Sequence, residues 1–217
     1  NTDPQSSFGG IISFNGEVES TLAEKIISSF KEGVIAPSFS ESALEILSSK
    51  QNLRVLETSN FEHYHRNPTL RSLDKGWLLQ ESDEAMIHIS DCKVVTKRQP
   101  SKDELESLYF AWKIVKHVKS NAIVFARNKN TVGIGAGQMS RIDSVKIAEF
   151  KSIPDAKGCV MASDAFFPFR DGIDEAIKAG ITAVIQPGGS MRDQEVIDAA
   201  NEQNIDMVFT GMRHFKH

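Results

Sequence analysis

Residues 158–185 of the chain read GCVMASDAFFPFRDGIDEAIKAGITAVI. This stretch contains an apolar segment typical of a strand (158–162), an amphipathic helical segment (171–179) that Gly180 ends, and a second apolar strand (181–185). Two apolar strands joined by a helix are the building unit of a parallel sheet with helices packed on it. The stretch therefore predicts an α/β fold.

The same alternation continues on both sides of this stretch. Apolar strand-like segments lie at 121–126 and 205–209, and amphipathic helix-like segments lie at 140–150 and 193–203. Right-handed crossovers between such strands bury the apolar faces of the helices on the sheet. We expect one sheet in the second half of the chain, at least partly parallel, with helices covering it.

The first part of the chain, up to about residue 104, contains shorter segments with helix or strand patterns. Helices are predicted from Thr21, which forms a capping-box pattern with Glu24, and from Ser40, and a third helix begins with the capping box of Ser101 and Glu104. Short apolar runs predict strands at 34–36, 54–56, 76–79 and 93–96.

Residues 59–75 are polar and rich in Asn and His, and they are expected to be irregular. This segment is the best candidate for a domain boundary, which suggests one domain of residues 1–66 and another of residues 67–217. Two histidines of this segment, His63 and His65, have no zinc-site spacing around them and are interpreted as loop residues.

Composition excludes several classes of protein. The 217 residues carry 25 basic and 29 acidic side chains, a net charge of −4, which disfavours a general nucleic-acid binder. No apolar run approaches the roughly 18 residues of a membrane span. Cys92 and Cys159 are the only cysteines in the sequence and lie far apart in it, so no disulfide framework is indicated and we expect the protein in a reducing cytoplasm. The chain lacks an initiator Met and a signal peptide, which suggests that it starts inside a larger protein.

Two glycine-rich segments are candidate anion sites. Residues 133–138 follow a strand and precede a helix, but Gln138 stands where the dinucleotide fingerprint needs its last glycine, so a tight turn is the simpler interpretation. Ser140 and Arg141 then open the helix, where backbone N–H groups and a guanidinium can face one anion. Residues 187–190 have the same context, and either an anion site or an ordinary turn fits them.

The least ordinary segment is 163–172, where three phenylalanines surround a proline and are interrupted by Asp164, Arg170 and Asp171. An aromatic wall edged with charge suits a planar heterocycle. The C-terminal residues 213–217 have the same mixture. The motifs of serine hydrolases and P-loop enzymes are missing from the sequence.

Taken together and in order, these motifs resemble the transformylase domain of the bifunctional purine-biosynthesis family that combines AICAR transformylase and IMP cyclohydrolase. The segments that carry the resemblance are 3–10, 33–37, 119–122, 133–141, 163–171, 187–190 and 213–217.

The resemblance implies a cytidine-deaminase-like layered sheet with helices on both faces, in two similar subdomains. Residues 1–66 would be the remainder of an incomplete first subdomain, and 67–217 the second. It implies transfer of a formyl group from 10-formyltetrahydrofolate to AICAR ribonucleotide, at active sites shared across a homodimer, with neither nucleic acid nor membrane as partner. AICAR would contact Gly9, Glu32, Asn121, Arg141, Phe166 and Arg213, and the folate would contact Ile142, Pro168, Phe169, Asp171, Ser190 and Met191.

Physical chemistry suits these implied roles. Phe166 can stack on the imidazole ring, Asn121 can bind the carboxamide, and Arg213 can pair with the phosphate. Arg141 can bridge substrate and folate through its planar guanidinium, and Asp171 can accept a hydrogen bond from the pterin amino group.

Two departures from the family pattern bear on activity. The Lys-His-x-Asn-Pro-Cys-Gly motif that supplies the family's general base is missing, as is the cyclohydrolase domain; the catalytic residues are expected upstream of Asn1, and the isolated chain is expected to be inactive. Members of the family can hold a potassium ion, and the resemblance would place it beside Asp164. A non-catalytic α/β module that binds a nucleotide or an anion is the alternative, and a nicotinamide-linked oxidoreductase is a third reading.

Overall fold

The computed structural model describes residues 6–58 and 68–216. The chain divides into two compact units, residues 3–84 and residues 85–217. The predicted boundary between residues 66 and 67 lies outside the described residues, as do His63 and His65.

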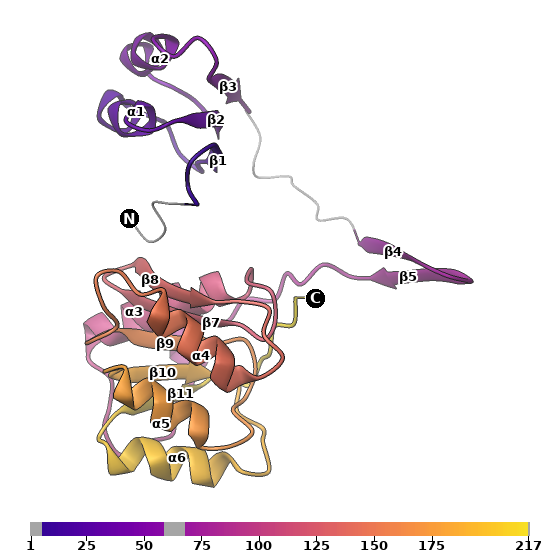
Figure 1. The fold of residues 1–217 in the computed structure, drawn as a ribbon, viewed down its shortest axis with the longest axis vertical. Helices are drawn as coiled ribbons and strands as arrows, with labels where there is room; N and C mark the ends of the chain where they lie inside the picture. Colours follow the sequence, from indigo (N-terminus) through magenta and orange to yellow (C-terminus); the bar gives the residue numbers. More distant parts are fainter. Residues whose placement is uncertain (1–5, 59–67, 217) are drawn as a thin grey trace. The chain divides into compact units, whose positions relative to one another are not determined.

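The unit of residues 85–217 is built on a six-stranded mixed sheet with the order β6-β11-β10-β9-β7-β8 (Figure 1). Strands β9, β10 and β11 are parallel to one another, while β6, β7 and β8 are antiparallel to their neighbours. The predicted α/β class is therefore confirmed. The strands are β6 Lys93–Val94, β7 Ile123–Arg127, β8 Asn130–Gly135, β9 Val160–Ser163, β10 Ala183–Gln186 and β11 Asp206–Phe209.

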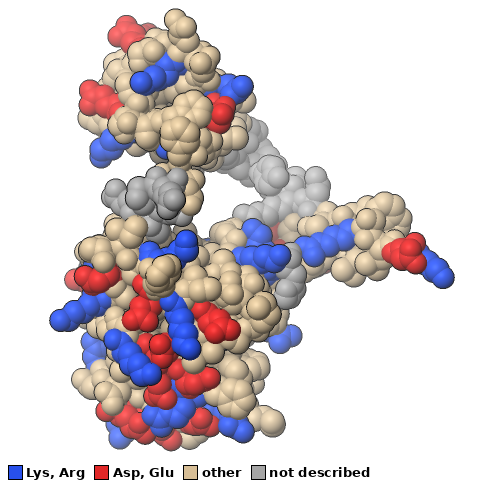
Figure 2. All heavy atoms as spheres, viewed as in Figure 1, with Lys and Arg blue, Asp and Glu red and all other residues tan. Residues whose placement is uncertain are grey.

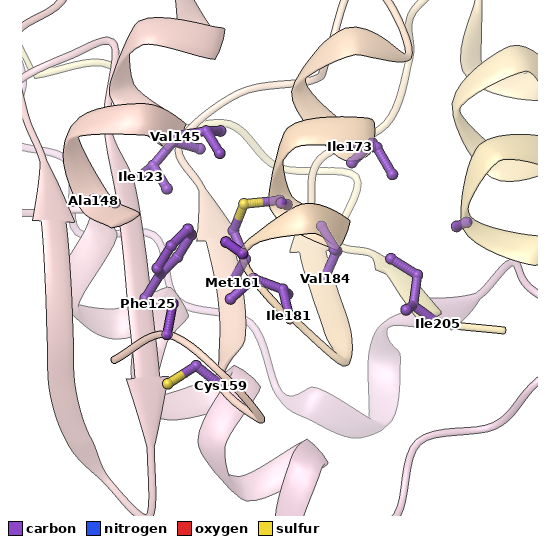
Figure 3. Close-up of a cluster of buried hydrophobic side chains, with 14 of the residues drawn as sticks. Ile123, Phe125, Val145, Ala148, Cys159, Met161, Ile173, Ile181, Val184 and Ile205 are labelled. Atoms are coloured by element: carbon purple, nitrogen blue, oxygen red, sulfur yellow. The ribbon is translucent and has the colours of Figure 1, made fainter. Parts of the chain in front are cut away.

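Helices cover both faces of this sheet because its strands are apolar on both sides. Ile123 and Phe125 of β7 pack into one buried cluster with residues of α4, α5 and α6 (Figure 3). Val124, between them, points to the opposite face and packs with Trp112 of α3. The helices are α3 Lys102–Val115, α4 Arg141–Phe150, α5 Asp171–Lys178 and α6 Asp193–Glu202, and a short 3-10 turn, η1, spans Ile89–Asp91.

The glycines at 133 and 135 correct one prediction, because they lie inside strand β8 and not in a strand-to-helix turn. Helix α4 packs directly on them. A Cβ at Gly133 would lie 2.0 Å from the carbonyl oxygen of Ala148, and one at Gly135 would lie 1.9 Å from that of Ser144. The glycines therefore allow a close helix–strand approach that no side chain permits.

Local signals at helix ends are confirmed in part. Ser101 and Glu104 form the predicted capping box of α3, and Gly180 ends the α5 segment with a φ of +86°. Ser40 caps its helix as predicted. Thr21 does not, because that helix begins one residue earlier with Glu19 at the N-cap.

The unit of residues 3–84 contains a three-stranded parallel sheet, β1-β2-β3, with two helices packed on a core that includes Val34 and Leu47. A separate hairpin of β4 and β5 corrects the prediction that the whole of 59–75 is irregular. The elements are β1 Gly10–Ser13, α1 Ser20–Ile27, β2 Lys31–Ala36, α2 Glu41–Ser48, β3 Arg54–Glu57, β4 Thr69–Leu73 and β5 Gly76–Gln80.

The surface of the larger unit mixes both signs of charge. Over the layer of α4, α5 and α6, acidic and basic side chains are interspersed on the face shown in Figure 2. Among the residues that the structure describes, no helix is both long enough and apolar enough to span a bilayer.

Candidate functional site

A pocket of about 430 Å³ lies in the unit of residues 85–217, where strand β9 ends and β7 begins. Its walls come from four segments far apart in sequence: the segment before β7, the start of α4, the connection from β9 to α5, and the C-terminal segment. The lining residues are Asn121, Met139, Ser140, Arg141, Ile142, Ala165, Phe166, Phe167, Pro168, Phe169, Asp171, Arg213 and Phe215.

Arg141 is held in the pocket wall by three protein groups. Its Nη1 donates to a carboxylate oxygen of Asp164 and, over 2.8 Å, to the hydroxyl of Ser163, and its Nη2 donates over 2.9 Å to Oδ1 of Asn121. Both Arg141 and Asp164 are buried, so the ion pair is shielded from water. A guanidinium has five N–H donors, and these bonds leave Nε and one Nη2 proton for a ligand.

Asn121 organises the loop before α4. Its Nδ2 donates to the carbonyl oxygens of Gln138 over 2.9 Å and Met139 over 3.1 Å, and its Oδ1 accepts from Arg141. Because both amide protons are used, a ligand would meet only the remaining acceptor position of Oδ1. The predicted contact with a carboxamide is thus restricted to accepting its N–H.

Asp164 also ties the C-terminal segment to the pocket. Its second carboxylate oxygen accepts from the hydroxyl of Ser120, and Ser120 and Lys216 exchange two further hydrogen bonds through the backbone of Lys216. The backbone N–H of His214 donates to the carbonyl of Asp164 over 2.9 Å. These bonds hold Arg213 at the pocket, where its guanidinium lies 5.3 Å from the ring centre of Phe215.

The phenylalanines after β9 have different roles. Phe167 is a fully buried core residue, and its backbone N–H donates to the side-chain oxygen of Gln186. Its ring packs so closely on Gly172 that a Cβ there would lie 2.6 Å from the ring. Phe166 and Phe169 are more exposed and line the pocket. The sequence pattern indicated an aromatic wall, and Phe166 and Phe169 are the two phenylalanines of the segment after β9 that expose part of their surface at the pocket.

The structure brings eight of the predicted site residues together in this pocket, and they are Asn121, Arg141, Ile142, Phe166, Pro168, Phe169, Asp171 and Arg213. Asp164 lies behind it, buried. Met139, Ser140 and Phe215 also line the pocket. Ser120 and Ser163 support it through Asp164 and Arg141. Of these five residues, only Ser140 was singled out in the sequence, as part of a candidate anion site. Their position next to predicted residues in the sequence was the available signal.

Ser190 and Met191 are not among the lining residues. Of the two interpretations of residues 187–190, the structure favours an ordinary turn, because the Asp193 carboxylate accepts from the N–H of Gly189 over 2.7 Å and from that of Ser190 over 3.1 Å. Met191 is fully exposed.

Gly9 and Glu32 belong to the other unit. Gly9 has a φ of +73° and donates to the carbonyl of Phe30, and Glu32 pairs with Arg54 over 2.7 Å. That unit has its own pocket of about 470 Å³, lined by residues 26–31 and 49–53. No arginine is among the residues that line this pocket, and its two cations are Lys31 and Lys50. The Lys31 ammonium donates to the carbonyl of Ser7 and the hydroxyl of Ser29.

A second ion cluster, largely buried, lies at the end of the sheet where β10 and β11 begin. Arg98 donates to Asp206, at the start of β11, to both carboxylate oxygens of Glu104, and to the carbonyl of Thr182. Burial, opposed by the charge of Arg98, raises the pKa of the Asp206 carboxyl to about 6. The cluster connects α3 with β10 and β11 and is remote from the pocket.

Replacing Asp206 by asparagine should change how stability depends on pH. The folded state holds the Asp206 proton more tightly than the unfolded state, so this carboxyl contributes stability at low pH that is lost as pH rises through about 6. The free energy of unfolding of the wild type should therefore fall relative to that of Asp206→Asn between about pH 4 and pH 6, measured by urea titration. A constant difference across this range would show that Asp206 does not titrate differently on folding.

In residues 6–58 and 68–216, no group of three or more His, Cys, Asp and Glu side chains is placed to hold a metal ion. The pocket therefore offers an aromatic wall, a buried and oriented guanidinium, a second guanidinium at Arg213 and the carboxylate of Asp171. This combination can bind a flat, polar and anionic organic molecule.

Comparison with known proteins gives the family. A solved structure described as "Structural genomics, protein ybgI, unknown function" aligns over 93% of this chain and 72% of its own length, with 11% identity and a TM-score of 0.23, which carries no argument about function or fold. The family model of the AICARFT/IMPCHase bienzyme matches residues 1–151, well over half of the chain. The chain belongs to this bienzyme family of purine biosynthesis, which joins AICAR transformylase and IMP cyclohydrolase.

Proposed function

We propose that the chain is the C-terminal part of the transformylase and takes part in moving a formyl group from 10-formyltetrahydrofolate to the 5-amino group of AICAR ribonucleotide. One observation carries the proposal. Asn121, Arg141, Phe166 and Arg213, which come from four distant segments, line a single pocket. The resemblance assigns these four residues to one substrate.

The pocket's chemistry fits that substrate. The half-buried ring of Phe166 can stack on the imidazole, and the exposed guanidinium of Arg213 can pair with the phosphate. Asn121 can accept the carboxamide N–H, and Arg141 still has two donors for substrate or folate. Phe169, which is 47% exposed, and Pro168 can pack against the pterin beside Ile142 and Asp171.

The chemical step needs groups from elsewhere. The amine of AICAR is a poor nucleophile, so it must be held against the formyl carbon while a base removes its proton. The pocket lining contains no histidine or lysine. We therefore propose that the base comes from the family motif upstream of Asn1, in a cytoplasmic homodimer with shared sites, and that the isolated chain binds its ligands without turnover.

The architecture proposed with this function is a pair of cytidine-deaminase-like subdomains, of which residues 1–66 represent the end of the first. Ser190 and Met191 would contact the folate, and Gly9 and Glu32 would contact AICAR. A potassium ion beside Asp164 would have to share a carboxylate whose two oxygens already accept from Arg141 and Ser120.

The missing base leaves a non-catalytic nucleotide- or anion-binding module as the alternative. Joining the chain to its upstream segment separates the two functions. Formyl transfer by the joined protein would support the enzyme, whereas binding of AICAR ribonucleotide with no turnover in a folded, joined dimer would support the module.

Replacing Arg213 by alanine should weaken the binding of AICAR ribonucleotide by about 1.5 to 3 kcal/mol, the scale of hydrogen bonds to charged groups. This corresponds to a dissociation constant raised by about 10- to 150-fold in isothermal titration calorimetry. Lys178→Ala removes an exposed cation from α5 and serves as the control. Equal affinities of the wild type and Arg213→Ala would remove Arg213 from the site.

A further inference from the structure

The C-terminal segment of residues 211–216 contributes two side chains to the pocket and one to the protein interior. Arg213 and Phe215 are exposed and line the pocket, whereas His214, between them, is only 2% exposed and is not among the lining residues. This alternation is typical of extended backbone, in which adjacent side chains point to opposite sides. His214 is therefore the one buried side chain among residues 211–216.

The imidazole of His214 packs against helix α3. Its ring centre lies 5.0 Å from that of Trp112, and the two ring planes are inclined at 51°, which is a tilted aromatic contact. Trp112 is fully buried and belongs, with Leu108, to the apolar cluster between α3 and the sheet. The contact therefore attaches the C-terminal segment to the packed core of this unit.

The backbone around His214 is bound to the pocket wall by hydrogen bonds. The N–H of His214 donates to the carbonyl of Asp164, and the N–H of Ser120 donates to the carbonyl of Lys216, each over 2.9 Å. Such bonds replace bonds to water, so each adds little net stability, whereas burial of the His214 ring adds packing contacts. A chain end stays ordered only where it is held in this way.

We propose that His214 is a positioning residue: its ring, packed on Trp112, fixes the C-terminal segment so that Arg213 meets the phosphate of the nucleotide. The inference rests on the proposed function, in which Arg213 pairs with that phosphate. An arginine that is placed before the ligand arrives loses less conformational entropy on binding. Without the His214 ring the segment must be ordered during binding, and the cost falls on the phosphate contact.

The test is a double-mutant cycle on the full chain. Isothermal titration calorimetry gives the dissociation constants of AICAR ribonucleotide and of its nucleoside, which lacks the phosphate, and their ratio measures the preference for the phosphate. His214→Ala should lower this preference by about 5-fold or more, up to the loss of about 10- to 150-fold expected of Arg213→Ala. In an Arg213→Ala background it should lower the preference no further, because a positioning residue acts only through the residue that it positions.

Three further variants separate this role from a general effect on folding. Leu108→Ala truncates a buried side chain one turn before Trp112, and it should lower the urea midpoint without changing the preference. His214→Phe keeps an aromatic ring beside Trp112 and should retain most of the wild-type preference. His214→Val is a milder truncation, and it takes the place of His214→Ala in the cycle if that variant does not fold.

Two results would overturn the positioning role. A wild-type preference in folded His214→Ala would show that the ring does not place Arg213. Losses that add up in the double variant, or that equal the loss in Leu108→Ala, would show that His214 acts independently of Arg213. Failure of the proposed function is distinct, because the wild type itself would then bind neither ligand or bind both with equal affinity.

Discussion

Asp164→Asn is expected to lower the free energy of unfolding of the larger unit by about 3 to 5 kcal/mol, the usual cost of removing one partner from a buried ion pair. The substitution keeps the shape of the side chain but leaves the Arg141 guanidinium buried without a counter-charge. It also weakens the bond that Ser120 donates, and with it the attachment of the C-terminal segment. Stability and ligand binding should therefore decline together.

Urea unfolding followed by tryptophan fluorescence measures this effect. Trp112 is buried in the larger unit, and a Trp77→Phe background removes the exposed tryptophan of β5. Asp174→Asn is the control, because it removes a carboxylate from a partly exposed pair with Arg170 and should cost at most about 1 kcal/mol. A loss in Asp164→Asn no greater than in this control would show that Asp164 does not hold the pocket together.

Gly135→Ala is expected to lower the free energy of unfolding of the unit of residues 85–217 by about 1 to 3 kcal/mol, the range for overpacking a core. The added Cβ would lie 1.9 Å from the carbonyl oxygen of Ser144 and 2.7 Å from its carbon. These are backbone atoms of α4 and cannot rotate away, so the helix must shift. Arg141 is the first residue of α4, so the shift should also weaken ligand binding.

Denaturant midpoints for Gly135→Ala should be compared with those for Gly16→Ala, whose added Cβ meets no atom within 4 Å. A loss of stability in Gly135→Ala alone supports close packing of α4 on β8. Equal midpoints for the wild type and Gly135→Ala would contradict it.

Much of the fold could be predicted because the decisive signals are local. The alternation of apolar strands and amphipathic helices after residue 100 depends on neighbouring residues, as does the capping box of Ser101 and Glu104. Strand β8 was not predicted because a glycine-rich segment is typical of a loop. Here Gly133 and Gly135 allow α4 to pack closely on the strand, and this tertiary contact cannot be read from the sequence. Strand β4 was missed because its surroundings are polar and its own residues are all exposed.

The site shows the same division. Eight of the residues selected through the resemblance line one pocket. They could be selected because the same motifs in the same order indicate that the same segments come together in the fold. The support behind them could not be predicted, because Asp164 binds Ser120 and Arg141 across 44 and 23 residues of sequence. The hydrogen bonds that Asp193 accepts from the N–H groups of Gly189 and Ser190 also depend on side-chain geometry. A glycine-rich sequence cannot distinguish such a turn from an anion-binding site.

The central claim is that the pocket between β9, α4 and the C-terminal segment binds AICAR ribonucleotide. Backbone amide chemical shifts of the isotope-labelled chain, followed by NMR during titration with this nucleotide, test it most directly. The claim predicts saturable shifts concentrated at Asn121, 139–142, 165–171 and 213–215. Shifts confined to residues 26–31 and 49–53, or no shifts at all in the folded protein, would contradict it.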